Sequence, residues 1–131
     1  MFIKFKIFKI FIFLFFIFFA NSYADYNWKK ITESNNRIYY VDHSSIKSSG
    51  NKVYFLTLTD YYKPDEFGDL SNIIYREADC SKMSYRFLKD FYYSQPMGNG
   101  EPSEIIDEVG EWRALVPGSV GEYMTEYVCN Y

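Results

Sequence analysis

Short runs of β-forming residues follow one another along most of this sequence, with only turns between them. The run KVYFLTLTDY at residues 52–61 is nearly continuous in apolar residues and predicts a central strand covered on both faces. Further strands are predicted at residues 28–31, 37–42, 71–80 and 84–93. Because no helical segment separates these strands, they are expected to pair as an antiparallel sheet.

The predicted strand at residues 84–93 alternates as expected for a sheet with one face in water. One face is predicted to carry Tyr85, Phe87, Phe91 and Tyr93, interrupted by Lys89. The other face is predicted to carry Ser84, Arg86, Asp90 and Tyr92, with Leu88 as the exception.

Turn-forming residues separate the strands and leave one long loop. Turns and short loops are predicted at residues 42–45, 48–51 and 62–68, where Asp, Ser, Gly and Pro gather. Residues 94–110 are predicted to be a surface loop with a short extended piece at Ile105-Ile106, and residues 111–116 a last strand.

The end of the chain predicts one helix. Ser119 and Glu122 have the spacing of a capping box, in which each side chain satisfies the free backbone N–H of the other. One apolar stripe able to lie on the sheet is formed by Val120, Tyr123, Met124, Tyr127 and Val128. Cys129 falls on the opposite side of the ideal wheel, so the helix should end or unwind there if this residue bonds to Cys80.

The first 24 residues have the layout of a signal peptide. Three lysines precede an uncharged apolar run of eleven residues at 10–20, and Ser22-Tyr23-Ala24 offers small residues for cleavage. A transmembrane helix needs roughly 20 apolar residues, about twice the length of this run. The rival interpretation is an uncleaved membrane anchor formed by residues 2–20. We predict cleavage after Ala24 and a domain of residues 25–131 that is exported to the periplasm, the outer-membrane surface or the medium.

Charge and residue counts exclude several classes of function. Without the three lysines of the leader, 11 basic residues face 17 acidic ones, a balance that argues against nucleic acid as a partner. One His and two Cys leave little material for a metal site or a catalytic relay. We therefore expect no cofactor, no metal and no enzymatic activity.

Cys80 and Cys129 are the only cysteines, and both lie in the part expected to be exported. An even count in an oxidising compartment predicts one disulfide. The closed loop of about 50 residues would contribute roughly 4 kcal/mol in the chain-entropy model. Two free thiols or a shared metal are the alternatives, although two thiolates and one distant His make a poor zinc site.

Three short motifs resemble functional sites but lack the necessary context. Asp42-His43-Ser44 holds the residue types of a hydrolase triad, but consecutive turn residues cannot assemble one. Gly98-Asn99-Gly100 lacks the strand, the helix and the Gly-Lys-Ser/Thr of a phosphate loop. Acids that do not match the spacing of a calcium-binding loop are Glu101, Glu104, Asp107, Glu108 and Glu111.

Three Tyr-Tyr pairs occur in the predicted strands or at their ends, at residues 39–40, 61–62 and 92–93. Neighbours on a strand point to opposite faces, so some of these rings must face solvent, a partner or the helix. Two interpretations stay open. The rings serve β-propensity and helix packing, or they form a tyrosine-bearing surface for a partner.

Several ordered blocks resemble the bacterial surface-adhesin protein E-like domains. They are YYVDHSSIKSSGNKVYFLTLTDYYKP at residues 39–64, the pair Asp79-Cys80, YSQPMGNGE at residues 93–101, Trp112, VPGSVGE at residues 116–122 and the terminal Cys129. The resemblance covers about residues 28–129. It implies an α+β fold, in which one antiparallel sheet of about six strands carries a C-terminal helix tied by a Cys80–Cys129 disulfide.

The same resemblance implies adhesion, which means an exported, non-enzymatic domain that binds host extracellular-matrix or serum proteins and in some members forms a homodimer. The alternative is a periplasmic structural or assembly protein that binds another cell-envelope component. The candidate protein-binding residues are Tyr61, Tyr62, Lys63, Tyr92, Tyr93 and Met97. The family pattern supplies no catalytic residue.

Overall fold

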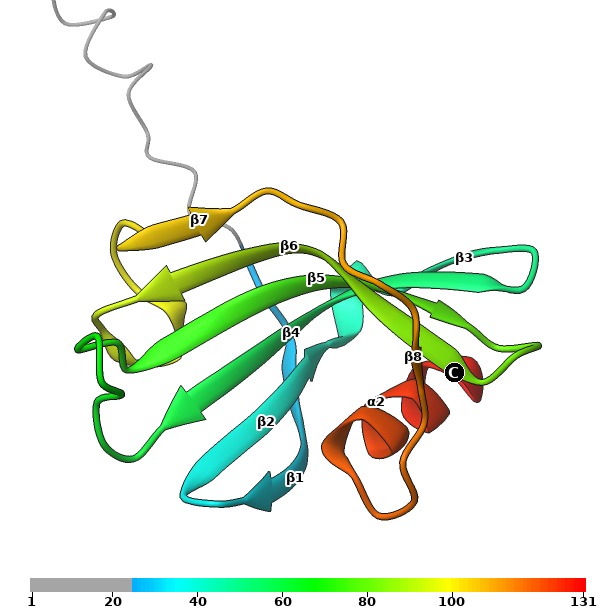
Figure 1. The fold of residues 1–131 in the computed structure, drawn as a ribbon, viewed down its shortest axis with the longest axis horizontal. Coiled ribbons are helices and arrows are strands. Elements are labelled where there is room, and N and C mark those ends of the chain that lie inside the picture. The colour runs from blue at the N-terminus through cyan, green and yellow to red at the C-terminus, as the bar shows by residue number, and fades with distance from the viewer. Residues whose placement is uncertain (1–24) are drawn as a thin grey trace, which may run out of the picture.

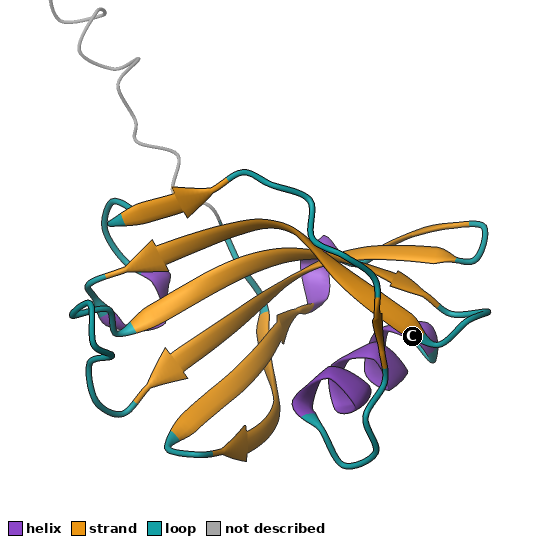
Figure 2. Ribbon diagram, viewed as in Figure 1, coloured by secondary structure: helices purple, strands orange, loops and turns teal. Residues whose placement is uncertain are grey.

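One antiparallel sheet forms the body of the protein, and the strand order of its main path is β1-β2-β4-β5-β6-β7 (Figures 1 and 2). These strands are β1 (Trp28–Ser34), β2 (Arg37–Asp42), β4 (Lys52–Tyr61), β5 (Ser71–Asp79), β6 (Ser84–Tyr93) and β7 (Glu104–Ile106). Two short strands, β3 (Lys47–Ser49) and β8 (Arg113–Ala114), pair with β4 and β6. The computed structural model describes residues 25–131, so the predicted signal peptide lies outside the described residues.

Helical structure in the described part of the chain is limited to α2 (Val120–Cys129) and two 3-10 turns, η1 (His43–Ser45) and η2 (Pro96–Gly98). The α+β architecture with a C-terminal helix is therefore confirmed. None of these helices is long and apolar enough to span a membrane.

Local sequence patterns predicted most strand limits. The bounds of β2, β4 and β6 are those expected, and β7 confirms the extended piece at Ile105-Ile106. The turn predicted over residues 48–51 is too long, because Ser48 and Ser49 pair with β4 and only Gly50 and Asn51 turn. The strand predicted at residues 111–116 is reduced to the two residues of β8.

A bulge in β6 contradicts the predicted faces of this strand. Tyr75 of β5 pairs with Lys89, but its neighbour Arg76 pairs with Phe87, which leaves Leu88 as the extra residue. The alternation therefore restarts at Leu88. Directly paired residues point to the same side, so Tyr85 and Phe87 share a face with Asp90 and Tyr92. Phe91 and Tyr93 lie on the opposite face with Arg86.

The same register defines the two faces of the whole sheet. The helix face, on which α2 packs, carries Arg37, Tyr39, Val41, Val53, Phe55, Thr57, Thr59, Tyr61, Asn72, Ile74, Arg76, Ala78, Tyr85, Phe87, Asp90 and Tyr92. The back face has its own apolar cluster of Leu58, Ile73 and Tyr93, against which Trp28, Tyr40, Leu56, Phe91 and Met97 pack.

Helix α2 covers one end of the helix face. Met124 and Val128 are buried against a cluster of Val41, Val53, Phe55 and Ala78, which we call the covered end. Tyr123 of the predicted stripe is exposed, whereas Gly121 and Thr125 are buried. A Cβ at Gly121 would lie 2.6 Å from the Tyr85 ring, so this glycine lets the helix approach the sheet closely.

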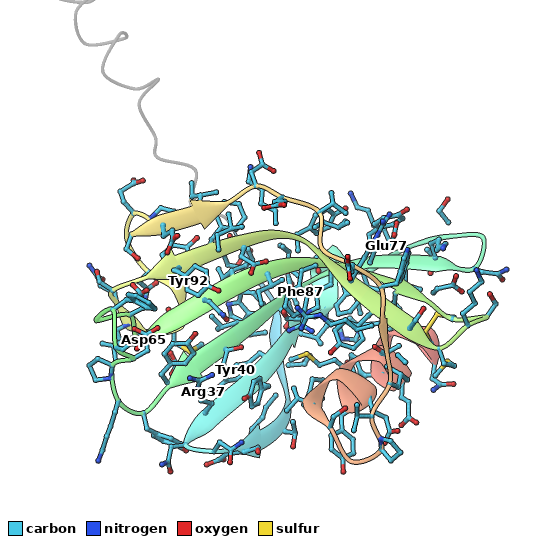
Figure 3. The ribbon with its side chains drawn as sticks, in the orientation of Figure 1. Arg37, Tyr40, Asp65, Glu77, Phe87 and Tyr92 are labelled. Atoms are coloured by element: carbon cyan, nitrogen blue, oxygen red, sulfur yellow. A yellow bond between two sulfur atoms is a disulfide. The ribbon has the colours of Figure 1, made fainter. Side chains whose placement is uncertain are left out.

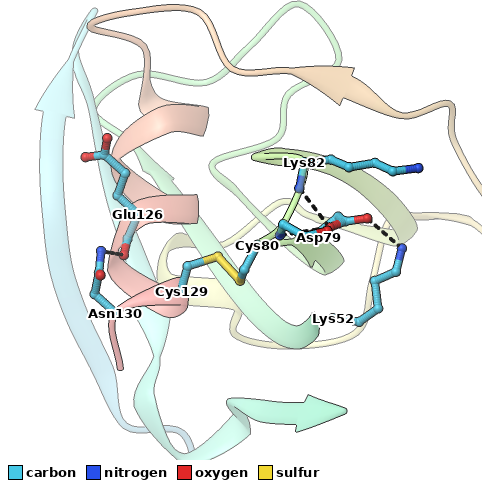
Figure 4. The surroundings of a disulfide bond; sticks show 8 residues. Lys52, Asp79, Cys80, Lys82, Glu126, Cys129 and Asn130 are labelled. Carbon is cyan, nitrogen blue, oxygen red and sulfur yellow. Dashed lines mark hydrogen bonds and ion pairs between the residues drawn. A yellow bond between two sulfur atoms is a disulfide. The ribbon is translucent and has the colours of Figure 1, made fainter. Parts of the chain in front are cut away.

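Both ends of α2 are fixed by contacts that the sequence largely predicted. Ser119 Oγ accepts a hydrogen bond from Glu122 N at 3.2 Å, which is half of the capping box. The Glu122 carboxylate instead accepts from Gly118 N. The helix ends at Cys129, whose sulfur is bonded to that of Cys80, with 5.6 Å between the two Cα atoms (Figure 4). The disulfide is therefore confirmed.

Candidate functional site

Helix α2 does not cover the other end of the helix face. In Figure 1, α2 lies against the right-hand end of the sheet, and the left-hand ends of β2, β4, β5 and β6 extend beyond it. We call this region the open end; it consists of Arg37, Thr59, Tyr61, Asn72 and Tyr92. Arg37 and Tyr92 are labelled there in Figure 3, with Phe87 nearer the helix. Unlike the covered end, the open end consists of residues with polar groups.

Two tyrosines and an arginine form the walls of the open end. The Arg37 guanidinium carbon lies 4.5 Å from the centre of the Tyr61 ring, a cation–π contact. Burial raises the pKa of Tyr61 to about 12, although Arg37 acts in the opposite direction. Burial also raises the pKa of Tyr92, helped by the negative charges of Asp90 and Glu104. Both phenols are therefore neutral hydrogen-bonding groups at physiological pH.

Asn72 lies beside Tyr92 on the neighbouring strand and has an unsatisfied acceptor. Its side chain is 8% exposed, and among the described residues Oδ1 has no hydrogen-bond partner. In register, Asn72 pairs with Thr59 on one side and Tyr92 on the other. A buried polar atom without a partner costs roughly 1–3 kcal/mol. Such an atom in a native protein calls for an explanation, and binding a donor from outside is one.

A buried arginine separates the open end from the covered end. Arg76 is 5% exposed, and its Nε donates to Thr57 Oγ1 at 2.8 Å. Burial lowers the pKa of Arg76 to about 10, so it stays charged at neutral pH. The guanidinium carbons of Arg76 and Arg113 lie 4.5 and 4.3 Å from the centre of the Phe87 ring. The pKa of the nearby Asp90 is raised by burial, against the effect of both arginines.

The loop after β4 adds acidic groups beside the open end. Asp65 Oδ1 accepts from the backbone N–H groups of Phe67 and Asp69, which fixes this loop. Asp69 is buried and accepts from Ser103 Oγ at 2.6 Å. The negative charges of both aspartates contribute to the raised pKa values of Tyr61 and Tyr92, so the loop lies close to both rings.

The residues predicted for protein binding are divided between two faces and a loop. Tyr61 and Tyr92 meet at the open end, whereas Tyr93 and Met97 pack in the apolar cluster of the back face. Tyr62 and Lys63 are exposed in the loop after β4, and the Tyr62 hydroxyl donates to Glu33 at 2.5 Å.

Sequence reasoning missed Arg37, Thr59 and Asn72 as members of this region. Asn72 carried the clearest signal, because Asn is depleted in strands and here stands inside a predicted strand, directly before Ile73 and Ile74. Arg37 and Thr59 could not be assigned without the register of β2, β4 and β5.

The other short motifs have structural roles. Asp42 caps η1 by accepting from Ser44 N, and His43 Nδ1 lies 3.2 Å from the Tyr127 hydroxyl. A Cβ at Gly98 would lie 2.6 Å from Ile73 Cδ1, so this glycine is needed for packing on the back face. Within residues 25–131, no group of three or more metal-binding side chains comes together.

Comparison with known proteins gives a family and a fold. The model of the family described as Surface-adhesin protein E matches residues 28–130. A crystal structure of Haemophilus influenzae protein E (crystal form II) is 17% identical, with a TM-score of 0.61 over 82% of this chain and 91% of that chain. Another structure of Haemophilus influenzae protein E, also 17% identical to this chain, has a TM-score of 0.58 over 82% of this chain and 87% of that chain. No curated protein sequence matches.

Proposed function

Because the chain belongs to the surface-adhesin protein E family, we propose that it is an exported, non-enzymatic binding domain that attaches to a protein partner through the open end. Membership of this family supports a surface adhesin. The observation that carries the proposal to this region is the buried Asn72 Oδ1, which lacks a partner beside two tyrosine rings. The test below decides whether the partner is a host matrix protein or a protein of the cell envelope.

The chemistry of the open end suits protein recognition. Tyr and Arg are enriched at the centres of binding surfaces, because each combines a large contact area with hydrogen-bonding groups. Arg37 and the Tyr61 ring already hold one another in place, so less side-chain entropy is lost on binding. A backbone N–H or a side-chain amide of the partner would supply the donor that Asn72 Oδ1 lacks, once the side chains that bury this atom turn aside on binding.

The proposal is tested by capture of partners with the purified protein, from a panel of extracellular-matrix and serum proteins and from envelope fractions of the producing cell. Tyr92→Ala and Arg37→Ala should weaken binding about tenfold or more if these residues are at the centre of the interface. Tyr123→Ala removes an exposed tyrosine from α2, remote from the open end, and is the matched control. Equal binding by all variants would remove the open end as the binding surface.

The location of the protein separates its two possible partners. Protease treatment of intact cells should degrade a domain displayed on the surface and spare one enclosed in the periplasm. Protection from protease would exclude a host adhesin and favour the alternative, a structural or assembly protein of the cell envelope.

A further inference from the structure

The two outer strands of the sheet differ in how their free edges are protected. An outer strand presents backbone N–H and C=O groups that no neighbouring strand uses, and proteins commonly guard such edges with lysines and bulges. β1 carries Lys29 and Lys30 and has a register irregularity at Ile31. β7 forms the opposite edge, at the top of Figure 1, and residues 101–111 contain no lysine or arginine.

The β7 edge also exposes apolar side chains. Ile105 is 52% exposed, Ile106 38% and Val109 58%. Beside them is a pocket of about 280 Å³ lined by Phe87, Asp90, Ile106, Glu108, Val109, Gly110 and Glu111. Its position next to the strand suits an apolar side chain of a peptide that runs along β7, since alternate residues of an added strand point to the same side.

Acidic groups surround this apolar surface and restrict what can occupy it. They are Glu101, Glu104, Asp107, Glu108 and Glu111. Lys89 offsets part of this charge, with its Nζ 3.5 Å from Asp107 Oδ2, as do Arg76 and Arg113 against the Phe87 ring, so the five acids outnumber three bases. A second copy of this chain would bring the same acids to the same edge, and like charges placed side by side disfavour that pairing. A basic segment would instead be attracted.

We propose that the edge of β7 and its adjoining pocket bind an extended, lysine- or arginine-bearing segment of a protein partner. The segment adds to the sheet as a further strand beside Glu104–Ile106, and one apolar side chain enters the pocket between Ile106 and Val109. Its basic side chains pair with Glu104 and Glu108. This inference rests on the proposed function in one respect, that the partner is a protein. It adds that the segment of the partner bound at β7, next to the open end, is basic and extended.

The probe for the test is a fluorescein-labelled synthetic peptide of about eight residues that alternates Lys and Val, long enough to span β7 and the pocket. Two further peptides keep its length. One replaces Lys by Glu, and the other carries N-methyl groups on every second backbone nitrogen. In about 0.15 M salt, the wild-type protein should bind the Lys-Val peptide at least about tenfold more tightly than either, as measured by fluorescence anisotropy.

Matched charge variants locate the site. Glu104→Lys combined with Glu108→Lys should reduce binding of the Lys-Val peptide about tenfold or more. Glu33→Lys combined with Glu126→Lys changes the net charge equally at exposed positions on β1, the opposite edge of the sheet, and on α2, and should have a much smaller effect. Circular dichroism verifies that each variant is folded.

Two results would overturn the proposal, because each indicates attraction by net charge alone. One is an equal loss of affinity for the Lys-Val peptide in the two double variants, and the other is binding of the N-methylated peptide as tight as that of the Lys-Val peptide. Arg37→Ala separates this inference from the proposed function, because Arg37 lies on β2, remote from β7 in the strand order. Peptide binding that survives Arg37→Ala, together with loss of partner capture, supports both surfaces. Absent peptide binding with partner capture that depends on Arg37 removes the β7 site alone.

Discussion

The covered end and the open end of the helix face are built on the same strands, yet their chemistry is opposite. At the covered end, Val53 and Phe55 are buried beneath Met124 of α2. Along β4 toward the open end, the same face continues with Thr57, Thr59 and Tyr61. A sheet face of this size could have been apolar throughout under a longer helix. The difference shows that α2 supplies apolar cover at one end only, whereas Thr59, Tyr61 and Asn72 at the other end are buried without it.

The largest expected effect tests whether the covered end depends on its disulfide. Replacing Cys80 and Cys129 together by Ala should lower the free energy of unfolding by about 4 kcal/mol, since the bond closes a loop with a sequence separation of 49 residues. Urea denaturation followed by circular dichroism measures this loss. A loss below about 1 kcal/mol would show that α2 packing alone holds the covered end.

A second prediction compares two side chains of α2. Met124→Ala should destabilise the protein by roughly 2–5 kcal/mol, because Met124 is fully buried and its truncation leaves a cavity against Phe55. Tyr123→Ala, one residue earlier and exposed, should change the stability by about 0.5 kcal/mol or less. Similar losses for both variants would contradict the packing of α2 described above.

A smaller effect of opposite sign is expected at the open end. Asn72→Leu removes a buried acceptor that has no partner and should stabilise the protein by about 1 kcal/mol, while weakening capture of the partner. The free energy of unfolding and the capture assay are measured on the same preparation. A clear loss of stability would mean that Asn72 serves the fold, and the contrast between the two ends would then fail.

How far the sequence predicts the molecule also differs between the two regions. The covered end was largely predictable, because the apolar run of β4, the stripe of α2 and the even cysteine count are local or compositional signals. At the open end, Tyr61 and Tyr92 were named from the sequence, but Arg37, Thr59 and Asn72 were not, since their membership depends on register. Because of the extra residue Leu88, Tyr85 and Phe87 lie on the face opposite to that of Phe91 and Tyr93. This bulge depends on how β6 pairs with β5, which the sequence of β6 alone does not define.

The smallest effects concern two aspartates whose pKa values are shifted in opposite directions. Hydrogen bonds from Ser81 and Lys52 hold the pKa of Asp79, next to the disulfide, well below its usual range (Figure 4). Burial raises the pKa of Asp90, beside the open end. A lowered folded-state pKa adds stability above the unfolded value of about 3.9, and this stability is lost as the pH falls. A raised folded-state pKa lowers the stability of the protein as the pH rises above the unfolded-state value.

The two aspartates should therefore respond oppositely to the same substitution. At pH 7, Asp79→Asn should lower the urea midpoint and Asp90→Asn should raise it, because the first removes a stabilised carboxylate and the second a destabilised one. Both differences should shrink as the pH is lowered below about 4, where the unfolded chain also becomes protonated. Midpoints measured between about pH 3 and 7 give the two curves. Shifts of the same sign at pH 7 would show that the charge of Asp90 is stabilised by Arg76 and Arg113, and the open end would then contribute to stability as the covered end does.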